Sequence, residues 1–121
     1  MTLNRRHRPF RIAAYGLVSA ALLWLTLSPS IAIPEPDMSD KIQHGLAWAA
    51  LTGLGLVLSS HRPRLIAAYA LAFGALVEVM QAAMGLGRQG DPLDFLADTA
   101  GVCLALVVWW AVLKWRKARP L

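Results

Sequence analysis

Apolar residues occur in four long blocks along this chain, and each block has a length typical of a membrane helix. Three stretches carry no charge, residues 12–34, 42–61 and 99–113, and a fourth, 65–87, carries only Glu78. A helix that crosses the hydrocarbon core needs about 20 mostly apolar residues. The pattern therefore predicts four membrane-spanning helices. The predicted spans are 11–29, 41–60, 65–85 and 92–113.

The fourth predicted span reaches full length only if it includes Asp94 and Asp98, which places two carboxylates at the membrane's edge. Asp91 followed by Pro92 supplies an N-cap and a proline at the first helical position. Asp94 then falls in the first turn, where negative charge suits the positive end of the helix dipole. Helix capping alone can therefore explain some of these acidic residues.

The composition supports a membrane protein with a single domain. Of the 121 residues, 57% are apolar and 16% are charged, and the mean hydropathy is +0.50. A soluble domain of this size exposes too much of its chain to water to be this apolar. No repeat or linker divides the sequence, so we expect one domain over residues 1–121. The predicted fold class is an all-α, four-helix transmembrane bundle.

The positions of the basic residues predict the orientation of this bundle. The chain has 12 Lys and Arg against 7 Asp and Glu, a net charge of +5. Basic residues in short loops of membrane proteins stay in the cytoplasm. Four helices place three segments on one side, and these segments hold Arg5, Arg6, Arg8, Arg11, Arg62, Arg64, Lys114, Arg116, Lys117 and Arg119. We therefore expect both termini in the cytoplasm and no nucleic-acid partner, because the orientation already explains the positive charge.

The first predicted span also has features of a cleavable signal peptide. Arginines precede an apolar run over 12–27, and Ser30 and Ala32 place small residues at alternate positions, as at a cleavage site. Pro29 lies close to that site, and cleavage would leave only three helices to form a bundle. A mature chain that begins at Ile33 would distinguish this alternative from a retained first helix.

Ionisable residues inside the predicted spans lie near the outer membrane surface. The third span runs outward from Arg64, so Glu78, 14 residues further on, lies about 21 Å along the helix axis. Gln81 lies one turn above Glu78. The other ionisable groups in the outer turns are His44, Asp94 and Asp98. Such groups usually point into a helix bundle and toward polar partners.

Helical spacing places these polar residues on shared faces with small residues, which permit close approach of helices. The three stripes are Asp40, His44, Leu51 and Gly55; Gly74, Glu78, Ala82 and Gly85; and Asp94, Asp98, Gly101 and Ala105. We therefore expect His44, Glu78 and Asp94 or Asp98 to converge on one outward-opening cavity. Arg88, in the loop before the fourth span, is expected at the mouth of that cavity.

Several stretches of the chain resemble a known family. They read DKIQHGLAWAALTGLGL at 40–56, GALVEVMQ at 74–81 and RQGDPLDFLADTAG at 88–101, preceded by LSPS at 27–30. Together they resemble the VanZ-like family of small bacterial membrane proteins over about residues 25–105. Carried over one at a time, the family's polar positions fall on Asp40, Lys41, His44, Glu78, Gln81, Arg88, Asp94 and Gly101.

This resemblance implies a multi-pass protein of the bacterial cytoplasmic membrane that acts in the cell envelope. The family takes its name from a member associated with teicoplanin resistance, and the resemblance implies no established reaction. At position 98 the family usually has Asn, whereas this chain has Asp98. A role that needs a neutral amide at this position therefore does not transfer.

Three functions fit the expected site. It can bind an anionic ligand, such as a lipid-linked envelope precursor or a phosphate head group, with Lys41 and Arg88 on the phosphate. It can be a membrane-embedded hydrolase or transferase in which Glu78, His44 or Asp94 transfers protons. It can be a structural network without a ligand. The residues of the expected ligand site are Asp40, Lys41, His44, Glu78, Gln81, Arg88, Asp94 and Asp98.

A zinc site made by His44, Glu78 and Asp94 is geometrically conceivable. Only one of the three histidines lies on the expected side, however, and no cysteine is near it. We therefore expect no metal and no other cofactor, and the lipid bilayer as the main partner.

Overall fold

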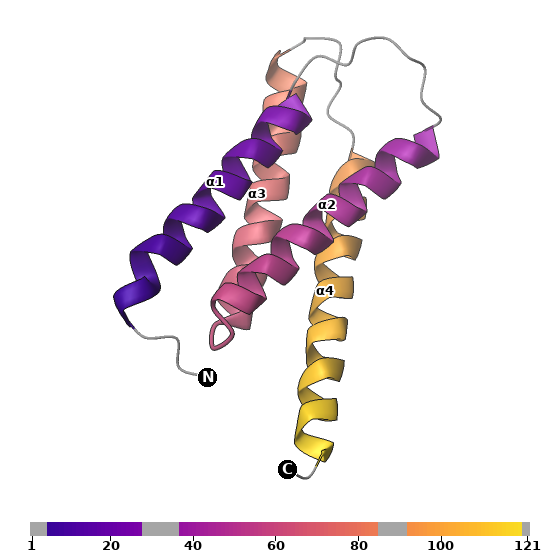
Figure 1. Ribbon diagram of the computed structural model, residues 1–121. Coiled ribbons are helices and arrows are strands. Elements are labelled where there is room, and N and C mark those ends of the chain that lie inside the picture. Colours follow the sequence, from indigo (N-terminus) through magenta and orange to yellow (C-terminus); the bar gives the residue numbers. More distant parts are fainter. Residues whose placement is uncertain (1–4, 28–36, 85–91, 120–121) are drawn as a thin grey trace.

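The computed structural model describes residues 5–27, 37–84 and 92–119, and these residues form helices without any strand (Figure 1). After a short 3-10 turn over Arg5–His7 there are four α-helices. They are α1 (Arg8–Leu27), α2 (Asp37–Leu58), α3 (Pro63–Met84) and α4 (Pro92–Ala118). The predicted all-α class with four helices is confirmed for this part of the chain.

The helix ends differ by a few residues from the predicted spans. Both α3 and α4 begin at a proline, Pro63 and Pro92, which suits the first helical position because its missing N–H would have no partner there. By contrast, α4 continues past the predicted end at residue 113 to Ala118. The prediction followed the apolar block, whereas Lys, Arg and Ala also favour helix outside a membrane. The helix α2 begins before residue 41, at Asp37, in a polar stretch that the apolar block did not include.

Three of the helices in the described residues are long and apolar enough to cross a membrane: Arg8–Leu27, Pro63–Ala83 and Pro92–Ala118. They expose large apolar side chains, among them Trp24 on α1, Val79 on α3 and Val107 on α4. Apolar surface of this extent is unfavourable in water and suits contact with lipid. The helices therefore indicate a membrane protein.

The remaining helix, α2, is not in this set because polar residues occupy its first turns, including Lys41 and His44. It makes its most extensive contact with α4, which it crosses obliquely (Figure 1). At the crossing, a Cβ added to Gly101 would overlap the carbonyl oxygen of Gly45 and lie 2.9 Å from the backbone nitrogen of Ala49. The two backbones thus touch, as the small-residue stripe through Gly101 predicted.

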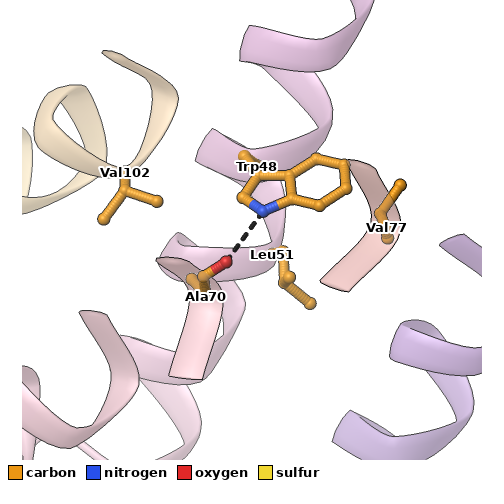
Figure 2. Close-up of a cluster of buried hydrophobic side chains, with 5 residues drawn as sticks. All are labelled: Trp48, Leu51, Ala70, Val77 and Val102. Carbon is orange, nitrogen blue, oxygen red and sulfur yellow. Dashed lines mark hydrogen bonds between the residues drawn. The ribbon is translucent and has the colours of Figure 1, made fainter. Parts of the chain in front are cut away.

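A small apolar core lies where α2, α3 and α4 meet (Figure 2). It consists of Trp48, Leu51, Ala70, Val77 and Val102, all of them buried. The indole Nε1 of Trp48 donates a hydrogen bond of 2.9 Å to the carbonyl oxygen of Ala70. This bond satisfies the one polar group of a fully buried tryptophan and fixes α2 against α3.

Figure 1 shows the start of α1, the α2–α3 turn and the end of α4 at the same end of the bundle. The basic residues that the structure describes in the predicted cytoplasmic segments lie toward this end. Arg8 and Arg11 begin α1, Arg62 and Arg64 flank the start of α3, and Lys114 lies in the last turns of α4. The helices therefore alternate in direction, as four consecutive spans would.

Candidate functional site

Five ionisable side chains from three helices meet at the end of the bundle opposite the α2–α3 turn. Lys41 and His44 come from α2, Glu78 from α3, and Asp94 and Asp98 from α4. We call these five residues the polar cluster. The side chains of His44, Asp94 and Asp98 are buried, and Lys41 and Glu78 are half-buried. The structure thus brings together residues that lie far apart in the sequence.

A close contact in the polar cluster joins His44 to Asp98. The imidazole Nδ1 lies 2.9 Å from the carboxylate Oδ1, and Asp98 is 0% exposed. On its other side, the imidazole Nε2 lies 4.0 Å from Oδ2 of Asp94. A carboxylate acceptor at Nδ1 keeps the proton on that nitrogen and aims Nε2 at Asp94.

Two neighbouring residues shape the space around this pair. The ring of Trp48 stacks on that of His44, with centroids 5.8 Å apart and planes inclined by 14°. A Cβ added to Gly74 of α3 would lie 3.1 Å from Oδ2 of Asp98 and 3.0 Å from Nε1 of Trp48. Gly74 therefore leaves room for Asp98. Sequence reasoning missed Trp48, although its position four residues after His44 places both on one helix face.

Lys41 and Asp94 form an ion pair between α2 and α4, with Nζ 3.3 Å from Oδ1. The positive charge predicted to meet an anionic ligand is therefore already in contact with a carboxylate. Together the cluster side chains include three carboxylates, from Glu78, Asp94 and Asp98, and one ammonium group.

The other predicted site residues lie outside this cluster or outside the described residues. Gln81 is buried and donates a hydrogen bond of 2.8 Å from Nε2 to the carbonyl oxygen of Thr26, near the end of α1. It therefore links α3 to α1. The side chain of Asp40 and the whole of Arg88 lie outside the described part of the chain, so their roles stay predictions.

A cavity of about 1360 Å³ lies at the other end of the bundle, between the starts of α1 and α3 and the end of α2. Its lining includes Arg8, Arg11 and Arg62 but no residue of the polar cluster. Arg11 donates a hydrogen bond of 2.8 Å from Nη1 to the carbonyl oxygen of Leu58 and thereby satisfies a carbonyl at the end of α2. The polar cluster does not line this cavity, and the outward-opening cavity predicted at His44, with Arg88 at its mouth, stays a prediction.

Three members of the polar cluster can hold a metal ion. One donor atom each of His44, Glu78 and Asp94 lies within 4.8 Å of the other two. Sequence reasoning gave this set little weight because it looked for further histidines or cysteines. The structure changes that view, because it brings the three donors together from three separate helices.

No family model, no curated protein and no solved structure matches this chain. The fold and the polar cluster define its class, an α-helical membrane protein with buried ionisable side chains at one end of the bundle.

Proposed function

We propose that the chain is a VanZ-like factor of the bacterial cytoplasmic membrane that binds an anionic, lipid-linked envelope ligand at the polar cluster. One observation supports this most strongly: His44, Glu78, Asp94 and Asp98 converge from three helices of a membrane-type bundle. Ionisable groups within membrane helices are costly and are usually retained for function. By the resemblance, the function is of the teicoplanin-resistance type.

In this proposal α2 is the fourth span, and both termini lie in the cytoplasm. The gathering of Arg8, Arg11, Arg62 and Arg64 at one end supports this orientation, since basic residues remain on the cytoplasmic side. The polar cluster then lies near the outer surface. A ligand's acyl or prenyl chain can lie along the exposed apolar faces of α3 and α4 while its head group reaches the cluster.

A second candidate function is a membrane-embedded hydrolase or transferase. The 2.9 Å contact between Asp98 and His44 favours it, because a carboxylate that orients an imidazole is a recurring arrangement in general acid–base catalysis. His44 would accept a proton through Nε2, and Glu78 or Asp94 would return one. Conversion of a lipid-linked ligand to a product by the purified chain, lost in Glu78→Gln, would favour this function over binding alone.

We expect Glu78→Gln to abolish ligand binding while the chain remains folded in the membrane. The substitution keeps the size of a half-buried side chain and removes a carboxylate that would accept hydrogen bonds from hydroxyl or amide groups of the ligand. Native mass spectrometry of the chain purified from bacterial membranes should show an anionic lipid-linked species on the wild type and not on this variant. Expression of the wild type in a susceptible bacterium should raise the inhibitory concentration of teicoplanin several-fold.

His61→Ala is the matched control, because His61 is exposed in the α2–α3 turn, at the end of the bundle opposite the polar cluster, and this variant should bind ligand as the wild type does. The proposal would be contradicted by a wild-type chain that carries no such species. A species that Glu78→Gln retains in full would contradict it as well.

A further inference from the structure

The polar cluster has the donors of a metal site. His44, Glu78 and Asp94 offer an imidazole nitrogen and carboxylate oxygens within 4.8 Å of one another, from α2, α3 and α4. Zn²⁺ takes nitrogen and oxygen ligands at about 2.0–2.2 Å, so two bound donors lie at most about 4.4 Å apart. Small side-chain rotations therefore suffice to bring these donors onto one ion.

The setting of His44 matches that of a metal-binding histidine. Such a histidine usually donates its other ring N–H to a carboxylate, which fixes the tautomer and orients the ring. Here Nδ1 lies 2.9 Å from Oδ1 of Asp98, and Nε2 lies 4.0 Å from Oδ2 of Asp94. Stacking against Trp48 holds the ring in this orientation. Asp98 then acts as a positioning residue and need not touch the ion.

The charges of the cluster also favour a cation. Glu78, Asp94 and Asp98 carry three carboxylates against the single ammonium of Lys41, and His44 is neutral in the form that binds metal. A divalent cation held by His44, Glu78 and Asp94 would place positive charge beside these carboxylates, which are ligands that such cations accept.

We propose that His44, Glu78 and Asp94 bind one divalent transition-metal cation such as Zn²⁺, with Asp98 orienting His44. This inference rests on the proposed function. A bound cation would explain how a cluster rich in carboxylates receives an anionic head group. The bound ion presents positive charge to a phosphate or carboxylate oxygen of the ligand, which the carboxylates alone would repel.

Isothermal titration of Zn²⁺ into the full chain, purified in detergent and stripped with a chelator, tests this proposal. We expect one ion per chain, an affinity loss of at least about tenfold in Glu78→Gln, and a loss of about 10- to 100-fold in Asp98→Asn. His61→Ala and Cys103→Ala, which remove an exposed imidazole and an exposed thiol, should bind as the wild type does. Circular dichroism of each variant confirms that it is folded.

The proposal is overturned if the wild type binds no stoichiometric ion. It is overturned equally if binding survives in Glu78→Gln or disappears in His61→Ala, since the ion then lies elsewhere. Repeating the native mass spectrometry after chelation separates the two proposals. If the ligand binds equally with and without chelator, the proposed function holds and the cation has no role in ligand binding. If Zn²⁺ binds but no lipid-linked ligand is found, the metal site holds and the proposed function is contradicted.

Discussion

Gly101→Ala is expected to lower the free energy of unfolding by about 1–3 kcal/mol, the usual cost of overpacking a tight contact. The new methyl group would overlap the carbonyl oxygen of Gly45 and crowd the backbone nitrogen of Ala49. Both obstacles are backbone atoms, so no side-chain rotation can relieve them and α2 must move away from α4. Because this crossing also positions the polar cluster, Gly101→Ala should weaken ligand and metal binding as well as lower the stability.

Gly53→Ala, on α2, is the matched control, because a Cβ added there meets nothing within 4 Å. Alanine favours helix over glycine by about 1 kcal/mol, so this variant should be as stable as the wild type or more stable. The same substitution, glycine to alanine, is therefore expected to lower stability at Gly101 and to leave it unchanged or raise it at Gly53. Thermal unfolding in detergent measures both, and equal midpoints for the two variants would contradict the close crossing of α2 and α4.

His44→Ala is expected to cost at least about 1–3 kcal/mol, the range for leaving a buried hydrogen-bonding group without its partner, and more when that group is a carboxylate. The substitution leaves the carboxylate of Asp98, which is 0% exposed, without the imidazole that lies 2.9 Å away. It also removes the ring on which Trp48 stacks. Unfolding of purified protein, followed by tryptophan fluorescence, gives the size of the loss.

His61→Ala removes the same side chain from an exposed position in the α2–α3 turn. Surface substitutions of this kind usually change stability by no more than about 0.5 kcal/mol. If His44→Ala were as stable as His61→Ala, the contact between His44 and Asp98 would contribute little to the fold, contrary to its geometry.

The helices could be predicted from the sequence because each coincides with an apolar block bounded by charge, proline or glycine. The start of α4 at Pro92 follows from its capping residues, and the close approach at Gly101 follows from a stripe of small residues. The end of α4 at Ala118 could not be predicted in the same way. The apolar block marks where a membrane would end, while the helix continues through Lys and Arg residues that are also good helix formers.

The candidate site could be predicted only in outline. Periodicity within each helix showed that His44, Glu78, Asp94 and Asp98 can face the bundle interior, and the structure brings them together. Which groups pair depends on how the helices cross one another. The periodicity within a single helix gives no information about that crossing. The pairing of His44 with Asp98, and that of Lys41 with Asp94, therefore came from the structure.

Gln81, on α3, is a second residue whose partner could not be predicted from spacing within one helix. It follows Glu78 by three residues, about 60° around the helix, and its amide donates to the carbonyl oxygen of Thr26 on α1. Spacing alone placed both residues near one site. The neighbour that each one meets was decided by where α1 and α4 pack on α3.

If the polar cluster serves binding rather than holding the helices together, an apolar replacement of its buried pair should preserve the fold. The decisive measurement is thermal unfolding of the double variant His44→Leu with Asp98→Val, in chelator, beside the wild type and the single variants. Replacing both partners of a buried hydrogen bond by apolar groups of the same shape can be nearly neutral or stabilising. We expect the double variant to unfold at or above the wild-type temperature, although each single variant unfolds below it. A double variant that unfolds well below the wild type would show that the pair is needed to hold the helices together and would contradict this account.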